Sequence, residues 1–101
     1  MNFVRQVVAY KRYFLGFYEQ LPAYVQAKIE WTLALIRVTN HVPEKYFKHL
    51  ENTRGLYEIR VEAGGNIYRI FCFFDKGNLI ILGNAFQKKT QRHRSRKLLK
   101  P

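Results

Sequence analysis

The 101-residue chain has the size of one small domain, and its 48% hydrophobic and 16% aromatic content predicts a fold with a hydrophobic core. This composition excludes intrinsic disorder and a collagen-like repeat. Eighteen lysines and arginines against seven acidic residues give a formal net charge of +11, which favours a polyanionic binding partner. The longest apolar runs are too short to cross a bilayer, so no membrane partner is expected.

Cysteine and histidine usage excludes further classes of protein. Cys72 is the only cysteine, so neither an internal disulfide nor a cysteine-based zinc site can form. The three histidines, His41, His49 and His93, show no metal-ligand spacing. We therefore expect no metal and no cofactor. The single cysteine and the absence of a signal-peptide layout favour a reduced, cytoplasmic setting.

The first half of the chain predicts a strand followed by two helices. Valines around Val7 favour an N-terminal strand. Aromatic residues recurring every three or four positions predict a helix over residues 10–21, and Pro22 allows a second helix to begin, which extends to about Asn40. The helical aromatics, Tyr13 and Trp31 among them, are expected in the core. Residues 46–54 have no clean period and are expected to form a loop or a single turn.

The second half of the chain predicts β-structure. Residues 56–63, 66–74 and 79–85 read as strands separated by Gly64-Gly65 and by residues 75–78, both of which are hairpin signals. The predicted fold class is α+β, with the N-terminal strand and a two-helix hairpin packed on one face of an antiparallel sheet. We expect a single domain over residues 1–101, ending in a basic tail or short helix, with residues 91–101 flexible.

Turn geometry then places individual side chains. A two-residue turn at positions 64–65 sets Arg60 directly opposite Arg69. Two facing cations destabilise a sheet unless an acid or a bound anion lies between them, so the pair indicates a functional site. The simpler alternative is a pair of surface charges bridged to nearby acids. We favour the functional interpretation and place Cys72 on the opposite, core face.

The next turn predicts how the last strand is aligned. If residues 76–77 are its centre, Arg69 faces Asn84 and Ile67 faces Phe86. Lys88 then leads out from the same edge. This register also assigns the faces of the strand, with Leu82 on the face of the arginines, and Leu79 and Ile81 on the core face.

Arginines and a lysine beside an aromatic ring suit a phosphodiester with a stacked base. RNA cleavage can use the substrate's own 2′-hydroxyl as nucleophile, so the protein needs only to position the phosphate, neutralise charge and move protons. Glu58 could accept the 2′-hydroxyl proton, or could be only a charge partner for Arg60. Lys88 or His93 could protonate the leaving oxygen. The catalytic candidates are Arg60, Arg69, Lys88, Glu58 and His93, and the RNA-binding candidates are Phe86, Asn84, Lys89, Arg92 and Arg54.

Three short motifs carry a resemblance to a known family. They are Leu-Tyr-Glu-Ile-Arg at 56–60, Tyr-Arg-Ile-Phe at 68–71 and Ala-Phe-Gln-Lys-Lys-Thr at 85–90. In this order, after a helix hairpin in a basic chain, they resemble the RelE/HigB-like toxins of bacterial type II toxin-antitoxin systems, most closely the phage-derived HigB branch. The resemblance implies a metal-independent endoribonuclease that cuts mRNA on the ribosome. It also implies a cognate antitoxin with a helix-turn-helix DNA-binding domain.

The resemblance assigns roles to particular positions. Glu58 and Arg60 match the family's first active-site pair, Arg69 matches a recurrent phosphate contact, and Lys88 matches a basic residue after the last strand. RelE-type members place a catalytic aromatic residue or histidine in the C-terminal segment, and after Phe86 this chain offers only His93 and its basic neighbours for that role. The chain also departs from many HigB-like relatives after residue 90. Two alternatives remain open: a ParE-like inhibitor of DNA gyrase, which shares the fold, and an RNA- or ribosome-binding module without catalysis.

Overall fold

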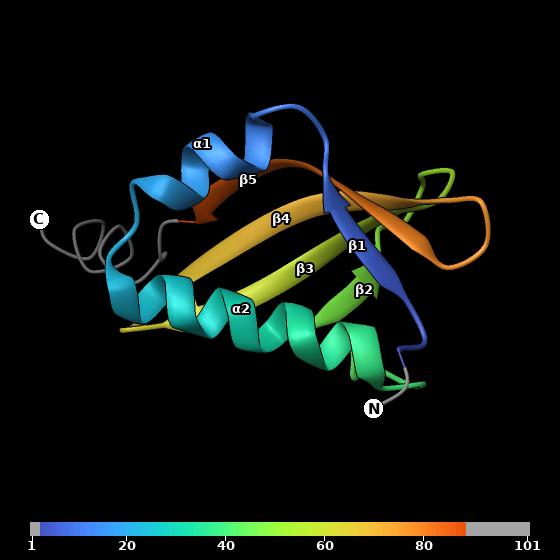
Figure 1. Cartoon of the computed structure of the whole chain (residues 1–101), viewed down its shortest axis with the longest axis horizontal. Coiled ribbons are helices and arrows are strands. Elements are labelled where there is room, and N and C mark those ends of the chain that lie inside the picture. Colours follow the sequence, from blue (N-terminus) through green and yellow to red (C-terminus); the bar gives the residue numbers. More distant parts are fainter. Residues whose placement is uncertain (1–2, 89–101) are drawn as a thin grey trace, which may run out of the picture.

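The computed structural model describes residues 3–88 (Figure 1). In chain order the elements are β1 (Gln6–Ala9), α1 (Tyr13–Glu19), α2 (Ala23–Val38), β2 (Phe47–His49), β3 (Leu56–Ala63), β4 (Asn66–Asp75) and β5 (Leu79–Lys88). The sequence-predicted basic tail, residues 91–101, lies outside the described residues. No helix within residues 3–88 is long and apolar enough to span a membrane.

The strands form one sheet in the order β1-β5-β4-β3-β2. The pairs from β2 to β5 are antiparallel, and both helices cover the same face of the sheet, with α1 over β5 and α2 over β3 (Figure 1). The predicted α+β class is therefore confirmed. The N-terminal strand differs from the expected antiparallel arrangement, because β1 pairs parallel to β5, with Val7 opposite Ile80. The long intervening chain allows β5 to return in the direction of β1.

The expected loop at residues 46–54 contains a strand, so that prediction was wrong. Phe47, Lys48 and His49 form β2 and pair with β3. The Phe47 ring stacks on Tyr57 at a centroid distance of 5.0 Å. Three residues are too few to display a two-residue period, and the strand forms because β3 and this aromatic contact stabilise it.

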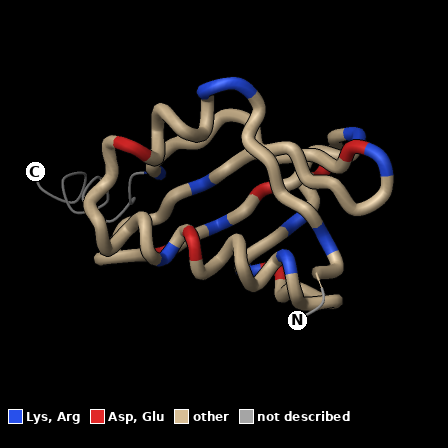
Figure 2. The backbone as a smooth tube through the Cα atoms, in the orientation of Figure 1, with Lys and Arg blue, Asp and Glu red and all other residues tan. Residues whose placement is uncertain are grey.

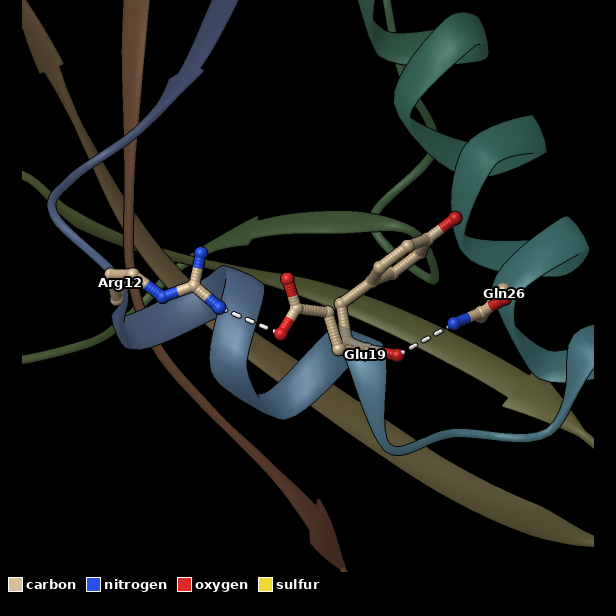
Figure 3. A network of polar contacts seen from close by, with 4 residues as sticks. Arg12, Glu19 and Gln26 are labelled. Atoms are coloured by element: carbon tan, nitrogen blue, oxygen red, sulfur yellow. Dashed lines mark hydrogen bonds and ion pairs between the residues drawn. The ribbon is translucent and has the colours of Figure 1, made fainter.

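The helix hairpin is joined by polar contacts between its two helices. Gln26 Nε2 on α2 donates a hydrogen bond to the Tyr18 carbonyl on α1 at 2.9 Å, and Arg12 bonds Glu19 at 2.6 Å along α1 (Figure 3). The Tyr18 hydroxyl donates to Glu30 on α2 at 2.6 Å. The hydrogen bond to the Glu30 carboxylate raises the pKa of Tyr18.

The second helix ends two residues earlier than predicted, at Val38, and an arginine from outside the helix satisfies its end. The Arg5 guanidinium donates to the carbonyls of Ile36, Thr39 and Asn40 at 2.9, 2.6 and 2.9 Å. These carbonyls lack partners within the helix, and a cation at this position also interacts favourably with the helix dipole. Arg5 therefore joins the chain before β1 to the end of α2.

The core lies between the helices and the sheet, and Cys72 is fully buried in it as predicted. The expectation that the helical aromatics are core residues is wrong for Tyr13 and Trp31, which are 52% and 48% exposed. Trp31 follows the buried Ile29 by two positions, which is a rotation of about 200° around a helix. Its ring consequently lies outside the buried stripe of α2.

The first hairpin matches its prediction. Gly64 and Gly65 both have positive φ, at 59° and 81°, and Ala63 pairs with Asn66. Positive φ at both central residues is the geometry of a type I′ turn, whose twist matches that of the flanking strands. Arg60 consequently lies opposite Arg69.

The second hairpin differs from its prediction by two separate shifts of one residue. Asp75 pairs with Leu79, so the loop has three residues rather than two. A β-bulge between the pairs Ile70–Ala85 and Cys72–Leu82 adds the second shift. Between loop and bulge a single shift reverses the faces, because side chains alternate along a strand. Leu82 and Ile80 are therefore the buried residues, in place of the predicted pair Leu79 and Ile81.

Beyond the bulge the two shifts add to two residues, which restores the predicted faces. Arg69 lies opposite Phe86 rather than Asn84, and Ile67 lies opposite Lys88 rather than Phe86. The change of register therefore brings Phe86 directly beside Arg69.

Candidate functional site

The candidate site lies on the face of the sheet that the helices leave uncovered. Arg60 on β3, Arg69 on β4 and Phe86 on β5 are successive partners across the three strands. We call these three residues the arginine row. Their neighbours in the strands, such as Ile59 and Ile70, are fully buried on the core face, so alternation directs the row outward. Figure 2 shows basic positions on neighbouring strands of the sheet, with acidic positions among them.

Each arginine of the row has an acidic neighbour. Arg69 Nε lies 3.4 Å from Glu58 Oε2, and the two side chains are 25% and 9% exposed. Arg60 Nη2 lies 3.8 Å from Glu62 Oε2, in a pair whose side chains are 38% and 68% exposed. These carboxylates offset the repulsion between the facing arginines, as the surface-charge alternative requires. The pairs differ in burial, and the Glu58 pair is the one screened from water.

Arg69 retains unused hydrogen-bonding capacity. Its Nε is buried, and despite its ion pair with Glu58 it makes no hydrogen bond within the described part of the chain. Buried donors in native proteins are nearly always satisfied, and each exception calls for an explanation. Because this Nε is buried, an anion bound over the row would contact the terminal N–H groups of the guanidinium instead.

The last strand adds an aromatic ring and a lysine. Phe86 is 39% exposed and contacts Phe71 edge to face, with ring centroids 5.3 Å apart. Lys88 is half-buried and lies one alternation further along β5, opposite Ile67. Phe86 and Lys88 therefore occupy the same face as the arginines, as the sequence predicted by a different register.

Two predicted site residues are not brought into the row. Asn84 is exposed in the bulged segment of β5, between the residues paired with Cys72 and Ile70. Arg54 precedes β3 and lines a hollow with Leu56 and Phe73. Leu56 is four residues from Arg60, so about 13 Å along the strand separates this hollow from the row. Lys89, Arg92 and His93 lie outside the described residues.

The sequence reasoning missed Lys48. It is exposed on β2 and pairs with Glu58, so it lies on the face of the arginine row. The sequence predicted a loop at residues 46–54. Loop residues have no strand register, so Lys48 could not be assigned to a face of the sheet. The available signal was the alternation of phenylalanine, lysine and histidine at positions 47–49, which is too short to be distinctive.

The core face of β4 holds the cysteine. Cys72 is fully buried on β4, and burial raises its pKa to about 12. Such a thiol is protonated and inaccessible, so it is not a nucleophile for this site. Within residues 3–88 we find no cluster of three or more His, Cys, Asp or Glu that could hold a metal ion.

The arrangement suits a bound phosphodiester. Two guanidinium groups offer planar, fork-shaped donors that match phosphate oxygens, and an adjacent exposed ring can stack on a base. Three cations, Arg60, Arg69 and Lys88, lie on this face, and Glu58 forms an ion pair with Arg69. The site can therefore bind a phosphate and stabilise additional negative charge on it.

One comparison with known proteins gives a match. The family model described as "Phage derived protein Gp49-like (DUF891)" matches residues 17–100. The match begins within α1 and includes α2 and β2 to β5, and so the whole arginine row. Searches of curated proteins and of solved structures return no significant match.

Proposed function

The chain belongs to the Gp49-like family of phage-derived proteins, a toxin-like family associated with toxin-antitoxin systems, and from this premise we propose that it is a toxin that cleaves RNA. The proposed substrate is mRNA on the ribosome, as in the RelE/HigB-like toxins that the motifs resemble. The α+β arrangement is consistent with a RelE-like fold. The observation that carries the proposal is the arginine row, in which Arg69 lies between Arg60 and Phe86 and forms an ion pair with Glu58.

In the proposed mechanism the RNA 2′-hydroxyl attacks the adjacent phosphorus, and its proton passes to water. The oxygen-phosphorus bond to the 5′-leaving oxygen breaks, and a 2′,3′-cyclic phosphate and a free 5′-hydroxyl form. Arg69 and Arg60 bind the non-bridging oxygens, where negative charge grows in the transition state. Donors that are already oriented by the sheet need no reorganisation during the reaction, so their contribution is large.

Phe86 of the row and the neighbouring Lys88 position the nucleotide and donate a proton, respectively. Phe86 stacks on the base next to the scissile phosphate, held in place by its contact with Phe71. Lys88 is the candidate donor of a proton to the 5′-leaving oxygen within the described residues, because it lies on the same face beyond Phe86.

Glu58 acts as a positioning residue in this proposal. Its side chain is only 9% exposed and its carboxylate faces Arg69, so access to a substrate hydroxyl is poor. Of the two roles considered for it, general base and charge partner, the contact with Arg69 favours the second. The partner is Arg69 rather than Arg60, whose nearest acid is Glu62.

A toxin-like family implies a cognate antitoxin. We propose that this antitoxin carries a helix-turn-helix DNA-binding domain, as partners of HigB-like toxins usually do. Its surface for this chain is expected to include acidic groups, because the face that binds RNA is basic.

The test is to incubate the purified protein with translating ribosomes and to map the 5′ ends of the mRNA. We expect new ends that depend on the protein, and their loss, by at least a hundredfold in rate, in Arg69→Ala. The control is Lys76→Asn, which removes one positive charge in the loop before β5, at a φ of 36° that asparagine tolerates. Its cleavage should equal that of the unchanged protein.

The same preparations separate the alternatives. If the mRNA stays intact and supercoiling by DNA gyrase is inhibited, the chain is a gyrase inhibitor and not a nuclease. Intact mRNA together with salt-sensitive ribosome binding would indicate a binding module without catalysis. Undiminished cleavage by Arg69→Ala would show that the arginine row is not the catalytic site.

A further inference from the structure

A second basic feature lies at the edge of the sheet, next to the arginine row. A groove of about 460 Å³ is lined by Lys28, Lys45, Tyr46, Arg60 and Glu62. Lys28 belongs to α2, on the core side of the sheet, whereas Arg60 and Glu62 project from the other face of β3. The groove therefore passes over the edge of β3, and Arg60 lines it as well as the row.

The edge is open at this point because β2 is short. The first residue of β2 is Phe47, and the Tyr46 carbonyl just before it accepts a hydrogen bond from the Arg60 backbone N–H at 2.9 Å. The Tyr46 N–H in turn donates to the Pro43 carbonyl at 2.9 Å, so the chain turns away here. This turn holds Lys45 and Tyr46 beside the exposed part of α2.

Tyr46 and two lysines line the groove, and Trp31 lies beside it in contact with Tyr46. Trp31 and Tyr46 meet edge to face, with ring centroids 5.6 Å apart. Lys28 Nζ lies 4.6 Å from the centroid of the Trp31 ring, and Lys45 Nζ lies 5.1 Å from that of Tyr46. Each lysine thus lies against an aromatic ring. A base could stack on the ring while its phosphate binds the ammonium group of the lysine.

The exposure of Trp31 argues against a purely structural role for this cluster. Its side chain is 48% exposed although it is the only tryptophan of the chain and lies on a helix with a fully buried opposite stripe. Large exposed aromatics beside cations are a feature of single-strand binding surfaces. Against three cations the groove has one acid, Glu62, so its net charge is positive.

We infer that this groove is a second nucleotide subsite, which binds the single-stranded RNA flanking the phosphate held in the arginine row. The inference rests on the proposed function and extends it along the substrate. A base stacks on Trp31 or Tyr46, Lys28 and Lys45 contact phosphates, and Arg60 joins the two sites. The volume lies in the range of small-molecule sites, which is sufficient for one nucleotide.

The single tryptophan provides a direct readout. A ten-nucleotide oligoadenylate, added to the intact protein, is expected to quench Trp31 fluorescence in a saturable manner. Affinity measured with a labelled oligoadenylate should fall about tenfold in Trp31→Ala. In the double variant Lys28→Ala, Lys45→Ala, the slope of log affinity against log salt should be shallower by about 1.4, because each phosphate contact on a single strand contributes about 0.7.

The matched control is again Lys76→Asn, which should retain both quenching and affinity. In the ribosome assay Trp31→Ala should raise the substrate concentration needed for half-maximal cleavage and leave the maximal rate unchanged, since Trp31 does not touch the reacting phosphate. Circular dichroism and a thermal melt confirm that each variant is folded.

The outcomes separate this inference from the proposed function. Cleavage without any change in Trp31 fluorescence would overturn the subsite alone. Saturable quenching without cleavage would overturn the nuclease and retain the subsite. Quenching by an acidic peptide but not by oligoadenylate would assign the groove to a protein partner and overturn the inference.

Discussion

Arg69 Nε lies 3.4 Å from Glu58 Oε2, and the Glu58 side chain is only 9% exposed. Removing one partner leaves the other charge poorly solvated, so Arg69→Ala and Glu58→Ala should each lower the free energy of unfolding by about 3 kcal/mol. The double variant should lose at least about 1 kcal/mol less than the sum of the two single losses. Urea denaturation of the four proteins measures this coupling.

The exposed pair Arg60 and Glu62 is the control for that coupling. Its closest atoms are 3.8 Å apart and Glu62 is 68% exposed, so solvent screens the interaction. We expect a coupling of at most about 0.5 kcal/mol from the same cycle. Equal couplings for the two pairs would contradict the conclusion that burial distinguishes Glu58.

Arg5 should stabilise the fold without affecting the site. It donates to three carbonyls at the end of α2, and hydrogen bonds from a charged group contribute more than neutral ones. Arg5→Ala should therefore lower the free energy of unfolding by about 2 kcal/mol. Thermal melts and denaturant titrations measure the loss, and RNA cleavage well below the melting temperature should be unchanged.

Arg12 gives the matched arginine-to-alanine comparison. It forms an ion pair with Glu19 at 2.6 Å, but the two side chains are 67% and 56% exposed. Surface pairs of this kind contribute less than about 1 kcal/mol, so Arg12→Ala should have the smaller effect. A loss as large as that of Arg5→Ala would show that capping of α2 is not what makes Arg5 important.

Two glycines should respond oppositely to alanine. Gly64 has φ of +59°, and a Cβ there would lie 2.5 Å from the Tyr24 hydroxyl oxygen, so Gly64→Ala should destabilise the protein by about 1 to 2 kcal/mol. Gly16 lies inside α1, where an added Cβ would meet nothing within 4 Å, and Gly16→Ala should stabilise by about 1 kcal/mol. Denaturant midpoints test both signs, and a neutral Gly64→Ala would contradict the turn geometry.

Cys72 should be unreactive in the folded protein. Burial raises its pKa from 9.0 to about 12, so almost no thiolate is present at pH 8. The folded state binds this proton more tightly than the unfolded state, so the resulting stabilisation is complete below pH 9 and is lost between pH 9 and about 12. A thiol reagent at pH 8 should react rapidly only in urea, and rapid reaction of the native protein would disprove the burial.

The arginine pair could be predicted because its geometry depends on local sequence. The two glycines at 64–65 accept the positive φ of a type I′ turn, and pairing then proceeds one residue at a time to Arg60 and Arg69. Phe86 could be assigned to the correct face but not to the correct partner. Its alignment depends on a three-residue loop and a bulge, and neither has a distinctive sequence signal.

The groove at the sheet edge could not be predicted from the sequence. Its members come from α2, from the turn before β2 and from β3, which are brought together only by packing. Trp31 read as a core residue because helical spacing alone does not identify which part of a wide apolar stripe is buried. The way α2 packs on the sheet decides which part of the stripe is buried.

Local sequence was sufficient to predict the α+β class, the helix hairpin and the facing of Arg60 and Arg69, because hydrophobic period and turn chemistry are properties of neighbouring residues. Three further relationships became visible only in the folded chain: β1 is parallel to β5, Phe86 faces Arg69, and Glu58 is buried against Arg69. These relationships join segments distant in the chain, and they follow from how strands align and how the core fills, which no local pattern encodes.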